Sequence, residues 1–81
     1  DLEDIQGHVN SACSSSYYFA KWNPKTMNGN LSINGSQICI LNSFSKCRMS
    51  MCEIGLNKTI GLYNITYIVI EKNETWEVYS E

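Results

Sequence analysis

The sequence predicts a small all-β sandwich, stapled by disulfides and carrying sugars on its surface. Short segments alternate apolar and polar residues with the period of a strand, and turn-forming residues separate them. Four cysteines and five Asn-X-Ser/Thr triplets occur within 81 residues. Six or seven short strands, with no convincing helix beyond residues 1–6, are typical of two packed sheets. We expect a single domain spanning residues 1–81.

The first half of the chain contains three predicted strands. Residues 16–22 form the first, which ends before Pro24 because the residue preceding a proline favours extended geometry. Residues 30–34 form the second, with Leu and Ile on its inner face and two asparagines on its outer face. A turn at residues 35–36 leads into the third, the apolar segment 37–41.

Residues 48–53 alternate again and predict a fourth strand. Cys47 and Cys52 have opposite parity, so on one regular strand their side chains would point to opposite faces. A bulge, a turn or different partners must therefore separate these two cysteines.

Residues 59–70 are rich in β-branched and aromatic side chains and predict one strand, or two strands that meet at a bend. A sugar on Asn64 would make its face the solvent face. The other face is then predicted to pack the core: Tyr63, Ile65, Tyr67 and Val69. Ile68 and Ile70 become candidates for exposure or partner contact, unless a bend resets the alternation.

The C-terminal residues predict a hairpin. The polar tetrad 71–74 suits a turn, and residues 75–79 alternate with Trp76 and Val78 on one side.

The four cysteines form an even set, which in a small secreted domain predicts two disulfides. A zinc site is disfavoured because no Cys-X-X-Cys pair exists, and we expect no metal and no cofactor. The residues leave three pairings open: 13 with 39 and 47 with 52, 13 with 47 and 39 with 52, or 13 with 52 and 39 with 47.

The five triplets are acceptors for N-glycosylation, and chance placement in this composition would give only about one or two. Their density predicts a secreted or cell-surface glycoprotein that folds in the lumen of the endoplasmic reticulum. Because a glycan must project into water, each acceptor is also predicted to lie at the surface: Asn30, Asn34, Asn57, Asn64 and Asn73.

Composition argues against several functional classes. Eight acidic and six basic residues give a formal charge of −2 without a basic cluster, so we expect no nucleic-acid partner. No apolar run reaches the roughly 18 to 20 residues of a membrane span. No signal peptide precedes Asp1, so we expect a processed or excised ectodomain that meets a membrane only through an anchor outside this chain.

We expect no enzyme. His8 is the only histidine, no nucleophile is evidently paired with it, and it is predicted to be a solvated surface residue. The acids are dispersed and form no motif for paired acid and base catalysis.

The stretches furthest from the sequons are residues 1–22 and 38–53. Glycans block the surface around them, so we place partner contacts in these two stretches. The candidates are exposed aromatic and methionine side chains: Tyr17, Tyr18, Met49 and Met51.

Cys13 followed by Trp22 resembles the strand B cysteine and strand C tryptophan of immunoglobulin-like domains. The apolar-Cys-apolar segment 37–41, then Cys52, then residues 58–66 resemble viral immunoglobulin-like glycoproteins. These are the adenovirus early-region-three glycoproteins and the cytomegalovirus family with antibody-Fc-binding members. The segment 13–22 is also similar to coronavirus accessory immunoglobulin-like proteins.

The resemblance implies an immunoglobulin-like β-sandwich that binds a host immune or cell-surface protein, as in viral immune evasion. It also implies disulfides between Cys39 and Cys52 and between Cys13 and Cys47. Two registers stay open at the end of the chain. In the first, residues 61–63 begin strand F and residues 75–79 form strand G; in the second, residues 59–66 form strand E and Trp76 begins strand F. The alternative function is the ligand-binding domain of a host immunoglobulin-superfamily receptor or adhesion protein.

Overall fold

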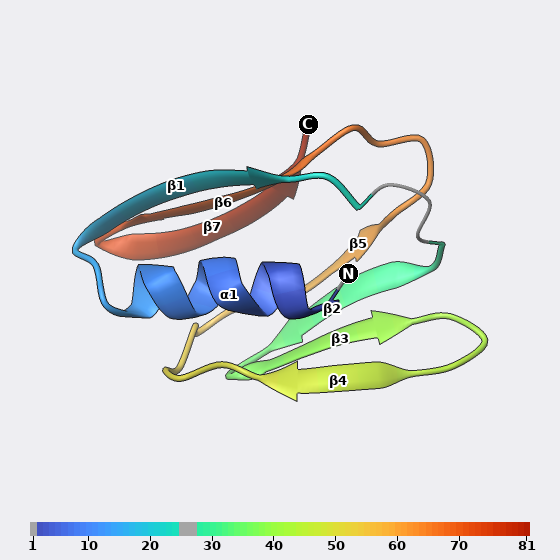
Figure 1. The fold of residues 1–81 in the computed structure, drawn as a ribbon, viewed down its shortest axis with the longest axis horizontal. Helices are drawn as coiled ribbons and strands as arrows, with labels where there is room; N and C mark the ends of the chain where they lie inside the picture. The colour runs from blue at the N-terminus through green and yellow to red at the C-terminus, as the bar shows by residue number, and fades with distance from the viewer. Residues whose placement is uncertain (1, 25–27) are drawn as a thin grey trace.

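The computed structural model describes residues 2–24 and 28–81, which form two antiparallel sheets and one helix (Figure 1). The three-stranded sheet has the order β1-β6-β7, and the four-stranded sheet has the order β4-β3-β2-β5. The chain is therefore mostly β, as predicted, with the expected number of strands. The elements are α1 (Leu2–Cys13), β1 (Tyr17–Trp22), β2 (Asn30–Asn34), β3 (Gln37–Leu41), β4 (Lys46–Met49), β5 (Asn57–Gly61), β6 (Ile68–Asn73) and β7 (Thr75–Ser80).

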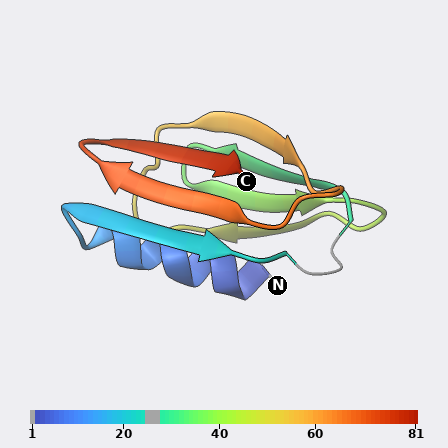
Figure 2. The ribbon, with the colours of Figure 1, turned by 90° about the horizontal axis from the view of Figure 1, so that it is seen from above.

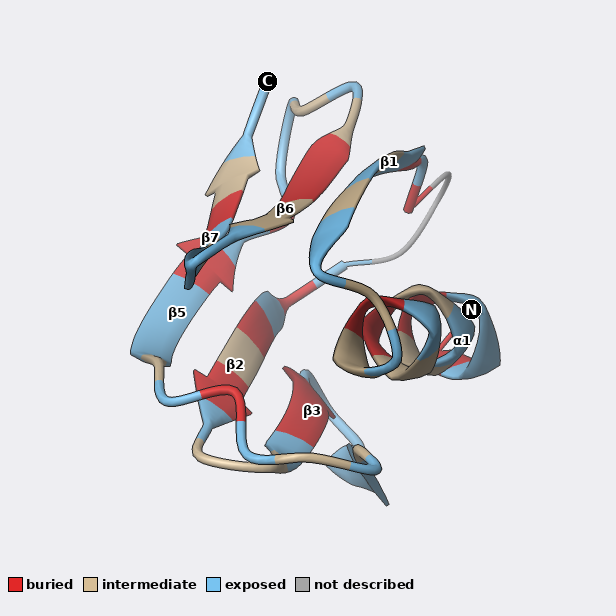
Figure 3. Cartoon of the chain, turned by 90° about the vertical axis from the view of Figure 1, so that its left-hand side faces the viewer, coloured by how far each residue is buried: buried red, intermediate tan, exposed pale blue. Residues whose placement is uncertain are grey.

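Helix α1 is longer than the prediction, which allowed a helix only over residues 1–6. Its buried residues follow the helical spacing and face the sheets: Leu2, Ile5, Val9 and Ala12. The helix lies along one side of the sandwich and contacts both β1 and β4, the edge strands of the two sheets (Figures 1 and 3). Packing of this apolar stripe stabilises a segment whose glycine and β-branched residues are weak helix formers.

The four-stranded sheet is a Greek key. Strands β2, β3 and β4 follow one another by hairpins, and β5 returns to pair with β2. Figure 1 shows this sheet and the three-stranded sheet as two layers, and Figure 2 shows them from above, with α1 along one side. The predicted inner residues of β2 are confirmed, since Leu31 and Ile33 are buried. Together with the other sheet they form one core, whose largest fully buried side chains also include Ile38, Ile68, Ile70 and Val78.

The segment 59–70 contains the bend that the sequence left open. β5 ends at Gly61 and β6 begins at Ile68, so the alternation restarts. Ile68 and Ile70 are fully buried, which is the outcome that the sequence left open for a chain with a bend at this point. Tyr63, predicted in the core, is 62% exposed. Asn64 has a left-handed backbone with φ 58°, a conformation that asparagine tolerates and a continuous strand does not contain.

Two further strand predictions are correct in kind and differ in extent. The C-terminal hairpin is confirmed, but its turn is shorter than 71–74, because β6 continues to Asn73 and only Glu74, at φ 61°, separates it from β7. The strand predicted at 48–53 lies at 46–49 instead. Cys47 is therefore within β4 while Cys52 lies beyond its end, which resolves their opposite parity.

Gly29 allows the chain to enter β2, and Gly29→Ala is expected to destabilise the fold by about 3 kcal/mol. Its φ is 107°, and an added Cβ would lie 2.2 Å from the backbone oxygen of Leu41. Gly55→Ala is the matched control, because φ is 76° there but the space around it is open. It should cost about 1 kcal/mol. Urea unfolding of both variants measures the difference, and equal losses would contradict the close contact.

Candidate functional site

All five sequon asparagines are exposed, as predicted. Three of them lie on the outer face of the four-stranded sheet, the face opposite the buried Leu31 and Ile33. Asn30 and Asn34 occupy alternate positions of β2, and Asn57 on β5 is the direct cross-strand partner of Asn34. Because paired residues share a face, glycans on Asn34 and Asn57 would stand side by side. This outer face, over β2 and β5, is the most heavily marked surface of the domain.

The other two acceptors lie at opposite ends of β6. Asn64 is in the connection that precedes this strand, and Asn73 is its last residue. Asn73 is the cross-strand partner of Tyr17 on β1, so a glycan there would lie beside the tyrosine. Tyr17 was expected to lie far from sugars because it is distant in sequence from every sequon. The strand pairing removes that separation.

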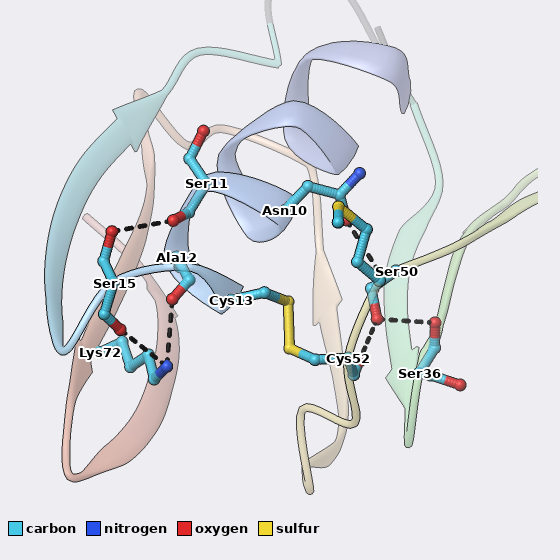
Figure 4. Close-up of a disulfide and its surroundings, with 10 residues drawn as sticks. Asn10, Ser11, Ala12, Cys13, Ser15, Ser36, Ser50, Cys52 and Lys72 are labelled. Atoms are coloured by element: carbon cyan, nitrogen blue, oxygen red, sulfur yellow. Dashed lines mark hydrogen bonds between the residues drawn. A yellow bond between two sulfur atoms is a disulfide. The ribbon is translucent and has the colours of Figure 1, made fainter.

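The first disulfide joins Cys13, the last residue of α1, to Cys52, with Cα atoms 5.9 Å apart (Figure 4). The chain beside it is also held by hydrogen bonds, since the Met51 N–H donates to Asn10 Oδ1 at 2.9 Å. Lys72 of β6 lies at the same end of the helix, where its Nζ donates to the backbone oxygens of Ala12 and Ser15 at 3.1 and 2.8 Å. A cation at a helix C-terminus interacts favourably with the helix dipole.

The second disulfide joins Cys39 to Cys47, which are direct partners on β3 and β4. All four cysteines are thus in disulfides, but the pairing that the resemblance implied, 39 with 52 and 13 with 47, is wrong. The reason is topological. The β3–β4 hairpin brings Cys47 opposite Cys39, and Cys13 lies in a helix rather than in a strand B.

The four residues predicted to contact a partner do not form one surface. Tyr17 is 60% exposed on the outer face of the three-stranded sheet, whereas Met49 and Met51 are 58% and 74% exposed at the end of β4, in the other layer. Helix α1 lies between the two sites. Tyr18 is half-buried, and its hydroxyl lies 2.8 Å from His8 Nδ1. His8 is half-buried as well, so the histidine predicted at the solvated surface keeps only part of its ring exposed.

The outer face of the three-stranded sheet also carries an exposed Phe19 and an ion pair. Lys21 Nζ lies 2.6 Å from Glu81 Oε1 and 5.5 Å from the centre of the Tyr67 ring. The hydrogen bond to Glu81 raises the pKa of Lys21. Desolvation, followed by the nearby glutamates, raises the pKa of Tyr79 on the same face. The ion pair links the C-terminal residue to β1. With both pKa values raised, Lys21 is charged and Tyr79 is protonated at neutral pH.

A hollow of about 450 Å³ lies between the start of α1 and the β3–β4 hairpin, and sequence reasoning missed it. We call it the hairpin hollow. Its walls combine apolar and charged side chains: Leu2, Ile40, Phe44, Glu3, Lys46 and Arg48. Phe44, in the hairpin turn, is 78% exposed. One signal in the sequence pointed here, because residues 37–52 contain two basic residues and none of the eight acids.

Among residues 2–24 and 28–81, no group of three or more His, Cys, Asp or Glu side chains is placed to hold a metal ion. Within the same residues, no helix is long and apolar enough to cross a membrane. Comparisons with protein-family models, curated proteins and solved structures find no match to this chain.

Proposed function

We propose that this chain is a non-enzymatic, N-glycosylated extracellular domain that binds a protein partner through the part of its surface without sequons. The placement of the sequon asparagines carries this proposal. All five are exposed, and three mark a single sheet face. Two disulfides in a domain of 81 residues fit folding in an oxidising compartment. A surface on which some regions carry sequons and others carry none suits a protein that presents one face to a partner.

The class of partner, a host immune protein met by a viral glycoprotein, rests on the resemblance of residues 13–66 to viral immunoglobulin-like proteins. The sheet order β1-β6-β7, with Trp22 on β1, has the form of the C-F-G sheet of immunoglobulin domains and supports that relation. Helix α1 and the order of the other sheet depart from it.

Glycosylation is tested by secreting the domain from mammalian cells and measuring its intact mass before and after enzymatic removal of N-glycans. We expect five glycans, and each single Asn→Gln substitution at an acceptor should remove one. Asn42→Gln is the matched control, because Asn42 is exposed but Phe44 stands where a sequon requires Ser or Thr. A secreted protein of unmodified mass would contradict the proposal.

Binding is tested with the same secreted protein, displayed as a tetramer and applied to a panel of immune and cell-surface ectodomains that includes immunoglobulin Fc. The expected result is saturable binding to at least one panel protein. Mutation of His8, or of any acidic residue outside the contact surface, should leave that binding unchanged. A tetramer that is folded, glycosylated and binds nothing on the panel would count against a recognition domain.

A further inference from the structure

The β3–β4 hairpin differs in charge from the rest of the molecule. Lys46 and Arg48 are its only charged residues, and every acid of this acidic chain lies outside residues 37–52. Arg48 Nη2 contacts Glu3 Oε1 at 3.2 Å, which partly neutralises it. Lys46 makes no hydrogen bond or ion pair with any residue that the structure describes. The hairpin thus presents an unneutralised cation beside the exposed ring of Phe44.

The cationic side chains point away from the sugars. Lys46 and Arg48 pair with the buried Ile40 and Ile38 across the hairpin, so they share the inner face of the sheet. The acceptors Asn30 and Asn34 lie on the outer face, where Asn30 is opposite Leu41. A glycan on β2 would therefore cover the Leu41 side of the hairpin and leave the side with the hollow open.

The hairpin hollow has room for a few side chains. Its volume of about 450 Å³ lies within the range of about 300 to 1,000 Å³ that is usual for ligand sites. Leu2, Ile40 and Phe44 supply apolar walls, and the cations Lys46 and Arg48 outnumber Glu3, the one carboxylate of the lining, which already pairs with Arg48. A complementary ligand would place an apolar group against the first set and a carboxylate against the second.

We propose that the hairpin hollow binds an acidic segment of the partner protein, one in which Asp or Glu stands next to a large apolar residue. This proposal rests on the proposed function and assigns it a contact site. The disulfide between Cys39 and Cys47 fixes the two strands that carry the hollow, so little conformational entropy is lost when a segment docks. Phe44 is the apolar anchor of the contact, and Lys46 is its main charge.

The direct test uses the secreted, glycosylated domain and two fluorescein-labelled hexapeptides, blocked at the C-terminus, that alternate Glu with Leu or Lys with Leu. Fluorescence anisotropy should show saturable binding of the Glu/Leu peptide and at least ten-fold weaker binding of the Lys/Leu peptide. The double substitution Lys46→Glu with Arg48→Glu should lower the affinity for the Glu/Leu peptide at least ten-fold. Phe44→Ala should lower it about five-fold.

Matched controls are available on the same chain. Lys58→Glu makes the same charge change at an exposed position of β5, and Tyr63→Ala removes another exposed ring; neither should alter binding. Lys46→Glu alone serves if the double variant is unstable, because Lys46 has no partner to lose among the described residues. Equal affinity of wild type and Lys46→Glu for the Glu/Leu peptide would overturn the proposal, as would absence of binding.

A glycan can also be used as a block. Phe44→Thr creates an acceptor at Asn42, at the hairpin tip, while Ser14→Asn creates one at the exposed Ser14 beyond the other end of α1. Both variants are tested against a panel protein that the wild-type domain binds. The Phe44→Thr variant should no longer bind this protein, and the Ser14→Asn variant should still bind it. Binding that survives Phe44→Thr would refute the site and leave the proposed function standing.

Other occupants give distinct results. Binding to vesicles rich in phosphatidylserine in place of the Glu/Leu peptide would overturn the proposal in favour of a lipid surface. Sedimentation of a dimer that Lys46→Glu dissociates would overturn it in favour of a second copy of the chain. A Glu/Leu peptide that binds as expected, while no panel protein binds, would support the hollow and count against the proposed function.

Discussion

Replacing Cys13 and Cys52 by serine is expected to lower the free energy of unfolding by about 4 kcal/mol, the largest effect of any change considered in this chain. The bridge closes a segment with a sequence separation of 39, so it restricts the unfolded chain strongly. In a domain of this size the core alone supplies only about 3 to 5 kcal/mol. We therefore expect the variant to be largely unfolded near body temperature, with loss of the helical signal in far-UV circular dichroism.

Replacing Cys39 and Cys47 by serine is the matched control. The sequence separation of this disulfide is only 8, and its two cysteines are already neighbours in a hairpin. The expected loss is about 2.5 kcal/mol, with the helix retained. Urea unfolding of both double variants gives the comparison. A larger loss from the hairpin bridge than from the helix bridge would contradict this account.

Ile5→Ala is expected to destabilise the domain by about 3 kcal/mol. Ile5 is fully buried in the middle of the apolar stripe of α1, where the helix packs along one side of the sandwich against the edge strands of both sheets. Alanine is the better helix former, so the helix itself gains, and the loss comes from the buried apolar atoms that are removed and from the cavity they leave. The midpoint of urea unfolding should fall accordingly.

Ser11→Ala on the exposed side of the same helix should change stability by less than about 0.5 kcal/mol. This control separates packing from helix propensity, since both variants place alanine in α1. A loss below 1 kcal/mol for Ile5→Ala would mean that the helix is only loosely attached to the sandwich.

The sequence predicts most strands because their alternation is local. Residues 30–34 and 75–80 show it clearly, and their inner residues are buried, except for the half-buried Trp76. The sequence allows a helix only over residues 1–6 and misses the rest of α1, because Gly7, His8 and Val9 are weak helix formers and because the packing that stabilises the helix comes from strands far along the chain. Propensity reports local preference, whereas burial decides the outcome.

The candidate site is predictable only in part, for a related reason. Exposure of the five acceptors follows from the chemistry of glycans and needs no fold. The proximity of Tyr17 to Asn73 and of Lys46 to Leu2 depends on strand pairing and helix position, which no local pattern encodes. The disulfides depend on the same long-range geometry, so a pairing taken from resemblance failed where the topology differs.

The alternate positions of Asn30 and Asn34 on β2 have a consequence for how the chain assembles. Slippage of β2 by one residue against its neighbours would turn both asparagines inward and bring Leu31 and Ile33 out. A sugar already attached to either asparagine cannot enter the interior, so that misfolded arrangement is excluded sterically. Under the proposed function, glycans attached to β2 before β5 is synthesised would therefore exclude the slipped pairing of β2 before β5 completes the sheet.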